Sequence, residues 1–153
     1  MRIRIEGRDL PGASCGPSPQ RPQGHANIHV GVQRRNKPGE LLGLVRGDAP
    51  RAAWDLDCVV KESGDGGVEF TGPYIQGGPG RRFIYLSWGV IEDDGTFTMF
   101  RRAKLMLDAV PSDVARRAAT SGELVGVVGL SDDKGNPRCA AVGPSAIEWS
   151  VGR

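Results

Sequence analysis

The sequence lacks the features that mark several protein classes. No apolar run approaches roughly 18 residues, so no membrane-spanning helix is expected. The N-terminal segment MRIRIEGRDLPG has no apolar core of the kind found in signal peptides. Only three cysteines occur, at Cys15, Cys58 and Cys139, and no CxxC pair is present, which argues against a disulfide framework. We therefore expect a soluble cytoplasmic protein whose thiols are free.

The chain also lacks a strong excess of either charge and any cofactor motif. Lys and Arg number 20 against 18 Asp and Glu, and this balance argues against nucleic acid as a partner. No stretch matches GxxxxGK[ST], and no GxGxxG stands between an expected strand and helix, so no cofactor is expected. His25 and His29, on one expected strand, would lie roughly 13 Å apart along it, so no metal site is expected either.

Glycine and proline, by contrast, are abundant. Gly (23) and Pro (11) make up more than a fifth of the 153 residues, which is typical of many short strands joined by turns. A chain of this length is expected to form a single domain over residues 1–153. The expected fold is mainly β, either an antiparallel barrel or a two-layer sandwich, with an α+β arrangement as the alternative.

Hydrophobic alternation predicts where the strands lie. Strands are expected over 1–6, 25–34, 41–45, 53–61, 68–75, 82–91, 124–130, 139–142 and 147–151. The segment 82–91 is apolar on both sides, which predicts a central strand. The predicted core residues are Trp54, Leu56, Ile84, Leu86 and Trp88.

Turn and cap residues predict how these strands are connected. Asp93-Asp94-Gly95 predicts a hairpin leading into extended chain over 96–110, although 101–107 also suits a helix. Ser112 as N-cap and Gly122 as stop predict one short helix over 113–121. The Pro- and Gly-rich segment 10–24 predicts a mobile loop.

Several runs resemble a bacterial family that is known only as a domain of unknown function. They are HVGVQRR at 29–35, RRFIYLSWG at 81–89, DDGTFTMFRRAKLML at 93–107 and GNPRCA at 135–140. The resemblance covers almost the whole chain, from the MRIRIEG start to the last expected strand. It implies a complete stand-alone protein, and it implies no activity, cofactor or catalytic residue.

Two Arg-Arg pairs flank the most aromatic part of the chain and suggest a binding site. We predict that the site is lined by His29, Arg82, Tyr85, Arg101 and Arg102. Guanidinium groups bind carboxylate or phosphate at two points, and neighbouring aromatic rings supply apolar walls. The sequence therefore favours an uncharacterised binding protein for a small anionic or aromatic ligand. Neither nucleic acid nor a membrane is expected as a partner, and the oligomeric state stays open.

The alternative is a small enzyme. His29 would act as acid or base near neutral pH, with Asp55 or Asp57 as the nearby carboxylate. A pocket that holds His29 together with a carboxylate would favour this alternative. The sequence alone identifies no catalytic residue, so whether the protein is an enzyme stays open at this point.

Overall fold

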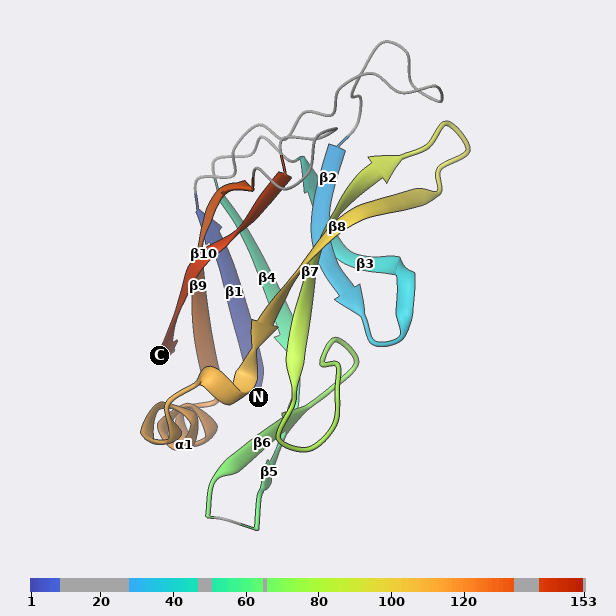
Figure 1. Ribbon diagram of the computed structural model, residues 1–153. Coiled ribbons are helices and arrows are strands. Elements are labelled where there is room, and N and C mark those ends of the chain that lie inside the picture. Colours follow the sequence, from blue (N-terminus) through green and yellow to red (C-terminus); the bar gives the residue numbers. More distant parts are fainter. Residues whose placement is uncertain (9–27, 47–50, 65, 134–140, 153) are drawn as a thin grey trace.

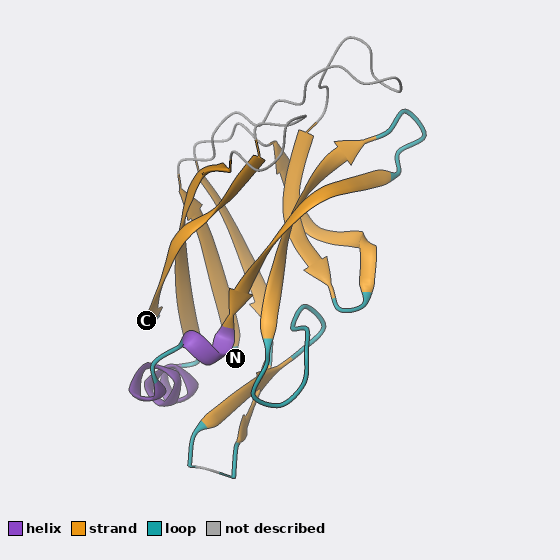
Figure 2. Ribbon diagram, viewed as in Figure 1, coloured by secondary structure: helices purple, strands orange, loops and turns teal. Residues whose placement is uncertain are grey.

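The described part of the chain forms two packed β-sheets, a small hairpin and one α-helix. The computed structural model describes residues 1–8, 28–46, 51–64, 66–133 and 141–152, so the predicted loop at 10–24 lies outside the described residues. Figure 2 shows that strands account for most of these residues. The prediction of a mainly antiparallel β-fold is confirmed, and the two sheets form a sandwich-like arrangement (Figure 1).

The first sheet has the strand order β10-β9-β1-β4. Its strands are β1 (Arg2–Arg8), β4 (Arg51–Asp57), β9 (Glu123–Asp133) and β10 (Ala141–Val151). β1 lies in the middle, antiparallel to β4 and parallel to β9. Ile3 and Ile5 point into the core and are fully buried, because strand side chains alternate between faces. The strand predicted over 1–6 is confirmed.

The second sheet has the order β3-β2-β7-β8 and packs on the first. Its strands are β2 (Ile28–Arg34), β3 (Lys37–Arg46), β7 (Phe83–Ile91) and β8 (Phe97–Met106). β7 is a central strand, as predicted, and the predicted turn at Asp93-Asp94-Gly95 joins it to β8. Residues 101–106 are strand rather than helix, and a short 3-10 helix, η1 (Leu107–Ala109), follows.

Three sequence-based boundaries are corrected by the structure. The strand predicted over 53–61 is broken at the buried Cys58, where the chain leaves β4 for the hairpin of β5 (Val59–Glu62) and β6 (Val68–Thr71). Residues 141–142 of one predicted strand and the predicted strand over 147–151 belong to one strand, β10, which continues through an irregularity at Pro144, and residues 139–140 lie outside the described residues. The strand predicted over 41–45 is longer than expected, because β3 already starts at Lys37.

Helix α1 (Ser112–Ser121) closes one end of the sandwich, and the predicted helix over 113–121 is confirmed (Figure 1). Pro111 takes the N-cap position that was predicted for Ser112, and no side chain caps the helix there. Gly122 ends the helix at φ 93°, a left-handed conformation that glycine adopts without steric penalty. Ala115 and Ala118 form the buried face.

All five predicted core residues are buried between the sheets: Trp54, Leu56, Ile84, Leu86 and Trp88. Trp54, on β4 of the first sheet, also donates its indole N–H to the carbonyl oxygen of Gly43, on β3 of the second sheet, over 2.8 Å. The two edge strands are therefore joined by a hydrogen bond as well as by packing.

Leu86→Ala is expected to lower the free energy of unfolding by about 2–5 kcal/mol, because Leu86 has no exposed surface and truncation leaves a cavity. Urea titration measures the loss. The matched control is Leu44→Ala, since Leu44 is 39% exposed, and its loss should stay below about 1 kcal/mol. Equal losses of stability in the two variants would contradict the buried position of Leu86.

Gly43→Ala is expected to cost about 2–4 kcal/mol of stability. Gly43 has φ +62°, and an added Cβ would lie 2.8 Å from Cδ1 of Trp54. Gly39→Ala, on the same strand, is the control, because nothing lies within 4 Å of its added Cβ. Urea titration followed by tryptophan fluorescence compares the two variants. A Gly43 variant as stable as the Gly39 variant would contradict the close approach of β3 to Trp54.

Candidate functional site

The outer face of the second sheet carries three of the five predicted site residues. Val30 and Val32 on β2 point into the core, so His29 and Gln33 point outward. Tyr85 lies on the outer face of β7, and Arg102 lies on the outer face of β8, directly opposite Ser87. His29, Tyr85 and Arg102 therefore share one face, although they come from three strands.

Four side chains on this face form a cation–aromatic cluster: Phe83, Tyr85, Arg102 and Lys104. The guanidinium carbon of Arg102 lies 4.4 Å from the centre of the Tyr85 ring, and Nζ of Lys104 lies 4.5 Å from the centre of the Phe83 ring. The two rings meet edge to face with their centres 4.8 Å apart. These contacts follow from the register, which places Tyr85 opposite Lys104.

The positive charge of the cation–aromatic cluster is not balanced by described carboxylates. Arg102 and Lys104 are exposed. Neither of them forms an ion pair within the part of the chain that the structure describes. Nη1 of Arg102 donates to Oε1 of the buried Gln33 over 3.3 Å, which holds the guanidinium above Tyr85. On the outer face of the first sheet, in contrast, Arg2 and Arg4 are paired with carboxylates.

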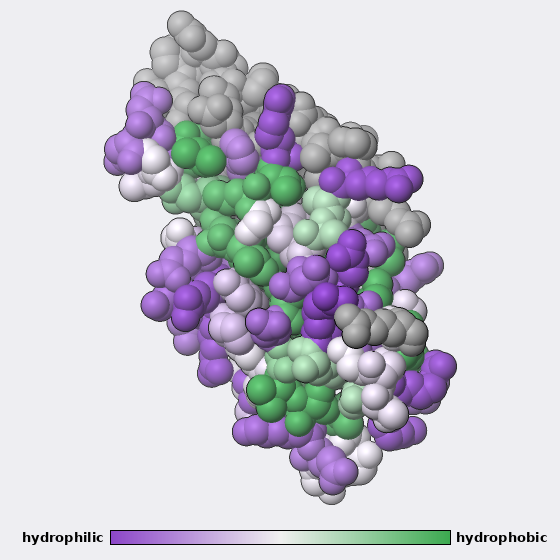
Figure 3. Space-filling model, turned by 180° about the vertical axis from the view of Figure 1, so that it is seen from behind, coloured by the Kyte–Doolittle hydropathy of each residue, from purple (hydrophilic) through white to green (hydrophobic). Residues whose placement is uncertain are grey.

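An apolar patch of Leu41, Leu44 and Phe97 lies beside the cation–aromatic cluster. Leu41 and Leu44 lie over Gly31, where an added Cβ would be 3.2 Å from each of them. The ring of Phe97 covers Gly89 in the same way, at 2.5 Å from an added Cβ. Figure 3 shows hydrophobic residues gathered between the charged tips of the β2–β3 and β7–β8 hairpins.

Ser87 lies between the apolar patch and the cation–aromatic cluster. It is opposite Gly31 on one side and Arg102 on the other, and it is fully buried. Its Oγ has no hydrogen-bond partner in the described part of the chain. Small residues thus lie under the middle of this face, while larger side chains surround them.

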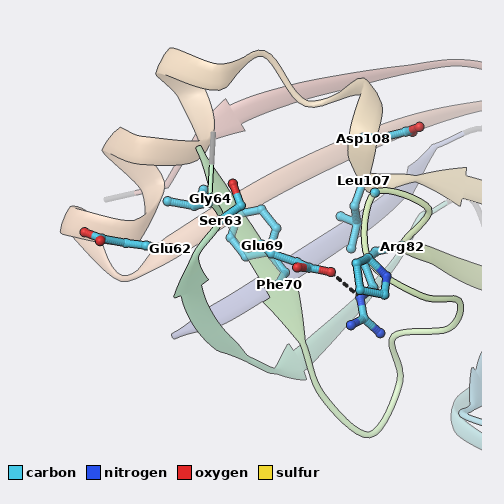
Figure 4. A pocket seen from close by; sticks show the side chains of 11 residues that line it. Glu62, Ser63, Gly64, Glu69, Phe70, Arg82, Leu107 and Asp108 are labelled. Atoms are coloured by element: carbon cyan, nitrogen blue, oxygen red, sulfur yellow. Dashed lines mark hydrogen bonds and ion pairs between the residues drawn. The ribbon is translucent and has the colours of Figure 1, made fainter. Parts of the chain in front are cut away.

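Arg82 lies elsewhere, in a cavity of about 450 Å³ beside the β5–β6 hairpin (Figure 4). Its Nε donates to Oε1 of Glu69 over 2.7 Å, and its Nη1 donates to the carbonyl oxygen of Gly77 over 2.8 Å. Arg101 is paired through its backbone with Trp88, and its side chain lies outside the described residues. The five predicted residues therefore do not meet at one point.

The carboxylates considered as partners for His29 lie on the other sheet. Asp55 and Asp57 are on the outer face of β4, where Asp55 accepts from Nη1 of Arg4 over 3.2 Å. His29 is on the outer face of the second sheet, so the core separates it from both. Among the side chains that the structure describes, no group of three His, Cys, Asp or Glu could hold a metal ion.

A family model matches residues 1–152. The chain belongs to the DUF5990 family, a family of unknown function. No curated protein and no solved structure matches it. None of the helices described in this DUF5990 protein is long and apolar enough to cross a membrane. The family confirms the resemblance seen in the sequence but supplies no activity, so the functional argument depends on geometry.

Sequence reasoning missed Lys104, Phe83 and Gln33. The signal was present for the first two, because Phe83 and Tyr85 stand two residues apart, as do Arg102 and Lys104. Residues at that spacing share one face of a strand, so the turn at 93–95 could have paired the two sets. For Gln33 the sequence showed only that its side chain points outward, because it follows the apolar Val32 on the strand.

Cys58 is expected to be inert toward alkylation in the folded protein. Burial raises the pKa of its thiol to about 11 from an ordinary value of 9.0, which lowers the thiolate fraction about a hundredfold at neutral pH. Iodoacetamide labelling followed by peptide mass spectrometry should show slow modification of Cys58 in buffer and rapid modification in urea. Rapid labelling in buffer would contradict the burial of this thiol.

Proposed function

We propose that this protein is a non-catalytic binding protein. Its site is the outer face of the second sheet, and its ligand is a small molecule that joins an anionic group to an aromatic or apolar body. The observation that supports this is the position of Arg102 and Lys104, which are exposed over two aromatic rings and have no described carboxylate as a partner. Two such cations attract an anion directly.

The geometry of Arg102 suits an anionic group with two oxygens. Gln33 accepts a hydrogen bond from Nη1 only, so N–H groups at Nη2 and Nε remain for a ligand. A carboxylate or phosphate can accept two parallel hydrogen bonds from one guanidinium group. Lys104 adds a second positive charge two residues along the same strand face, and it needs no fixed geometry because an ammonium group acts as a point charge.

The apolar patch suits the body of the same ligand. Leu44 is exposed enough to be covered on binding, and Phe97 offers a ring beside it. His29 lies opposite Gly89 and stands at the end of the site near Phe97. The net charge of only +2 favours a small ligand over an extended polyanion, which would need a broad basic surface.

A cytoplasmic location is part of the same proposal. Three cysteines without disulfide-like spacing are typical of proteins from reducing compartments, and Cys58 is free and buried. Many soluble metabolites are small anions at neutral pH, because their carboxyl and phosphate groups are ionised there. Such metabolites match the proposed ligand.

Phenyl phosphate tests the proposal by isothermal titration. The variant Arg102→Ala/Lys104→Ala is expected to bind it at least about tenfold more weakly, because charge-assisted hydrogen bonds contribute about 1.5–3 kcal/mol each. The matched control, Arg116→Ala/Lys61→Ala, removes one exposed Arg and one exposed Lys elsewhere. It should keep the original affinity. An absence of saturable binding, or an equal loss in both variants, would contradict the proposed site.

A further inference from the structure

The hydroxyl group of Ser87 lies in the middle of the outer face of the second sheet. Leu86 and Trp88 point into the core, so the side chain between them points outward. It has no exposed surface, and Oγ finds no hydrogen-bond partner among the residues that the structure describes. Most buried polar atoms are paired, because leaving one unpaired costs free energy. The Ser87 hydroxyl is therefore suited to a hydrogen bond with a ligand.

The cover over Ser87 is formed by the outer ends of neighbouring side chains. Gly31, opposite on β2, and Gly89, two residues along β7, contribute no side chains of their own. Leu44 leans over Gly31, and its Cδ2 would lie 3.2 Å from an added Cβ there. Phe97 leans over Gly89 in the same way. Rotamer changes at a binding surface are common, so access to Ser87 needs no movement of the strands.

Arg102 borders Ser87 on the other side, directly opposite on β8. The one hydrogen bond described for its guanidinium group runs from Nη1 to Oε1 of Gln33 over 3.3 Å. This is longer than the usual range of about 2.7–3.2 Å, so the bond is weak. A carboxylate forms shorter and stronger hydrogen bonds with a guanidinium group than a neutral amide does. A carboxylate can therefore replace Gln33 as the partner of Arg102.

The charge beside Ser87 suits a carboxylate better than a phosphate. Arg102 supplies one positive charge there, while Nζ of Lys104 is directed to the Phe83 ring, 4.5 Å from its centre. A carboxylate carries one negative charge, whereas a phosphate monoester carries about 1.5 to 2 at neutral pH. Burying the additional charge next to a neutral hydroxyl group would cost free energy. A phosphate is better placed at the exposed ends of Arg102 and Lys104.

We propose that the natural ligand of this face is a carboxylate with an apolar body, and that Ser87 determines this specificity. The Ser87 O–H donates to one carboxylate oxygen, Arg102 donates to the carboxylate from the other side, and the apolar body lies on the apolar patch. This inference rests on the proposed function, because it uses the same face and the same arginine. It adds the head group of the ligand and a residue that recognises it.

Isothermal titration of two ligands tests the role of Ser87: phenylacetate and phenyl phosphate. Ser87→Ala is expected to weaken phenylacetate binding about tenfold, because a hydrogen bond to a charged group is lost. It should change the affinity for phenyl phosphate less than twofold. The matched control is Ser150→Ala, which removes an exposed hydroxyl group from the first sheet and should change neither affinity. An unchanged affinity for phenylacetate, or an equal loss for both ligands, would overturn the inference.

Urea titration without ligand distinguishes a binding serine from a structural one. Ser87→Ala should unfold at the same urea concentration as the unaltered protein or at a higher one, because Oγ has no described partner to lose. Unfolding at a clearly lower concentration would overturn the inference, since it would reveal a hydrogen bond within the protein.

The Arg102→Ala/Lys104→Ala variant separates this inference from the proposed function. If that variant weakens phenylacetate binding and Ser87→Ala does not, the role of Ser87 is wrong and the proposed function stands. If neither ligand binds the unaltered protein in a saturable manner, both are wrong.

Discussion

The hydrogen bond from the Trp54 indole N–H to the Gly43 carbonyl oxygen joins the two sheets at one edge, where the core packs around the same indole ring. It connects β4, at the edge of the first sheet, to β3, at the edge of the second. The bond requires an irregular strand: Val30 pairs with Val45 and Val32 with Leu42, so Gly43 and Leu44 both face Gly31. This is a β-bulge with glycine in the left-handed conformation at its first position.

The bulge links the core to the proposed ligand-binding face. It brings the Gly43 carbonyl within 2.8 Å of the buried Trp54 and leaves Leu44 lying over Gly31 on the outside. One extra residue in β3 therefore contributes both to the closure of the sandwich edge and to the apolar patch. A regular β3 would place a single residue opposite Gly31, whereas the bulge places both Gly43 and Leu44 there.

The parts of the fold that could be predicted are those that are determined by a pattern of residues close together in the sequence. Alternation at Ile3 and Ile5, the apolar run of β7, the Asp-Gly turn and the Gly122 stop each depend on neighbouring residues. The parallel pairing of β1 with β9 joins residues 121 positions apart, such as Arg2 and Glu123, and it leaves no such mark. The break at Cys58 was missed because the alternation of buried residues continues through it from Trp54 and Leu56.

The site could be predicted in part, because some of its contacts also depend on residues that are close in sequence. The Arg-Arg pairs and the aromatic residues suggested a cation beside a ring, and Arg102 does lie over Tyr85. The partner of each Arg depends on strands that are distant in sequence. Arg82 faces Glu69 of β6, and Arg102 faces Gln33 of β2. Composition shows that Arg is abundant, but it cannot show which Arg is neutralised by the fold.

The central position of β1 has a consequence for how the protein is made. β1 is an inner strand of the first sheet, and its neighbour on one side, β9, is synthesised more than a hundred residues after it. Until then the β1 edge and part of its apolar face have no partner, and loop closure over more than a hundred residues has to follow. The second sheet has all its strands before residue 107 and can assemble earlier. The strands of the first sheet can therefore all pair only after those of the second sheet have been synthesised.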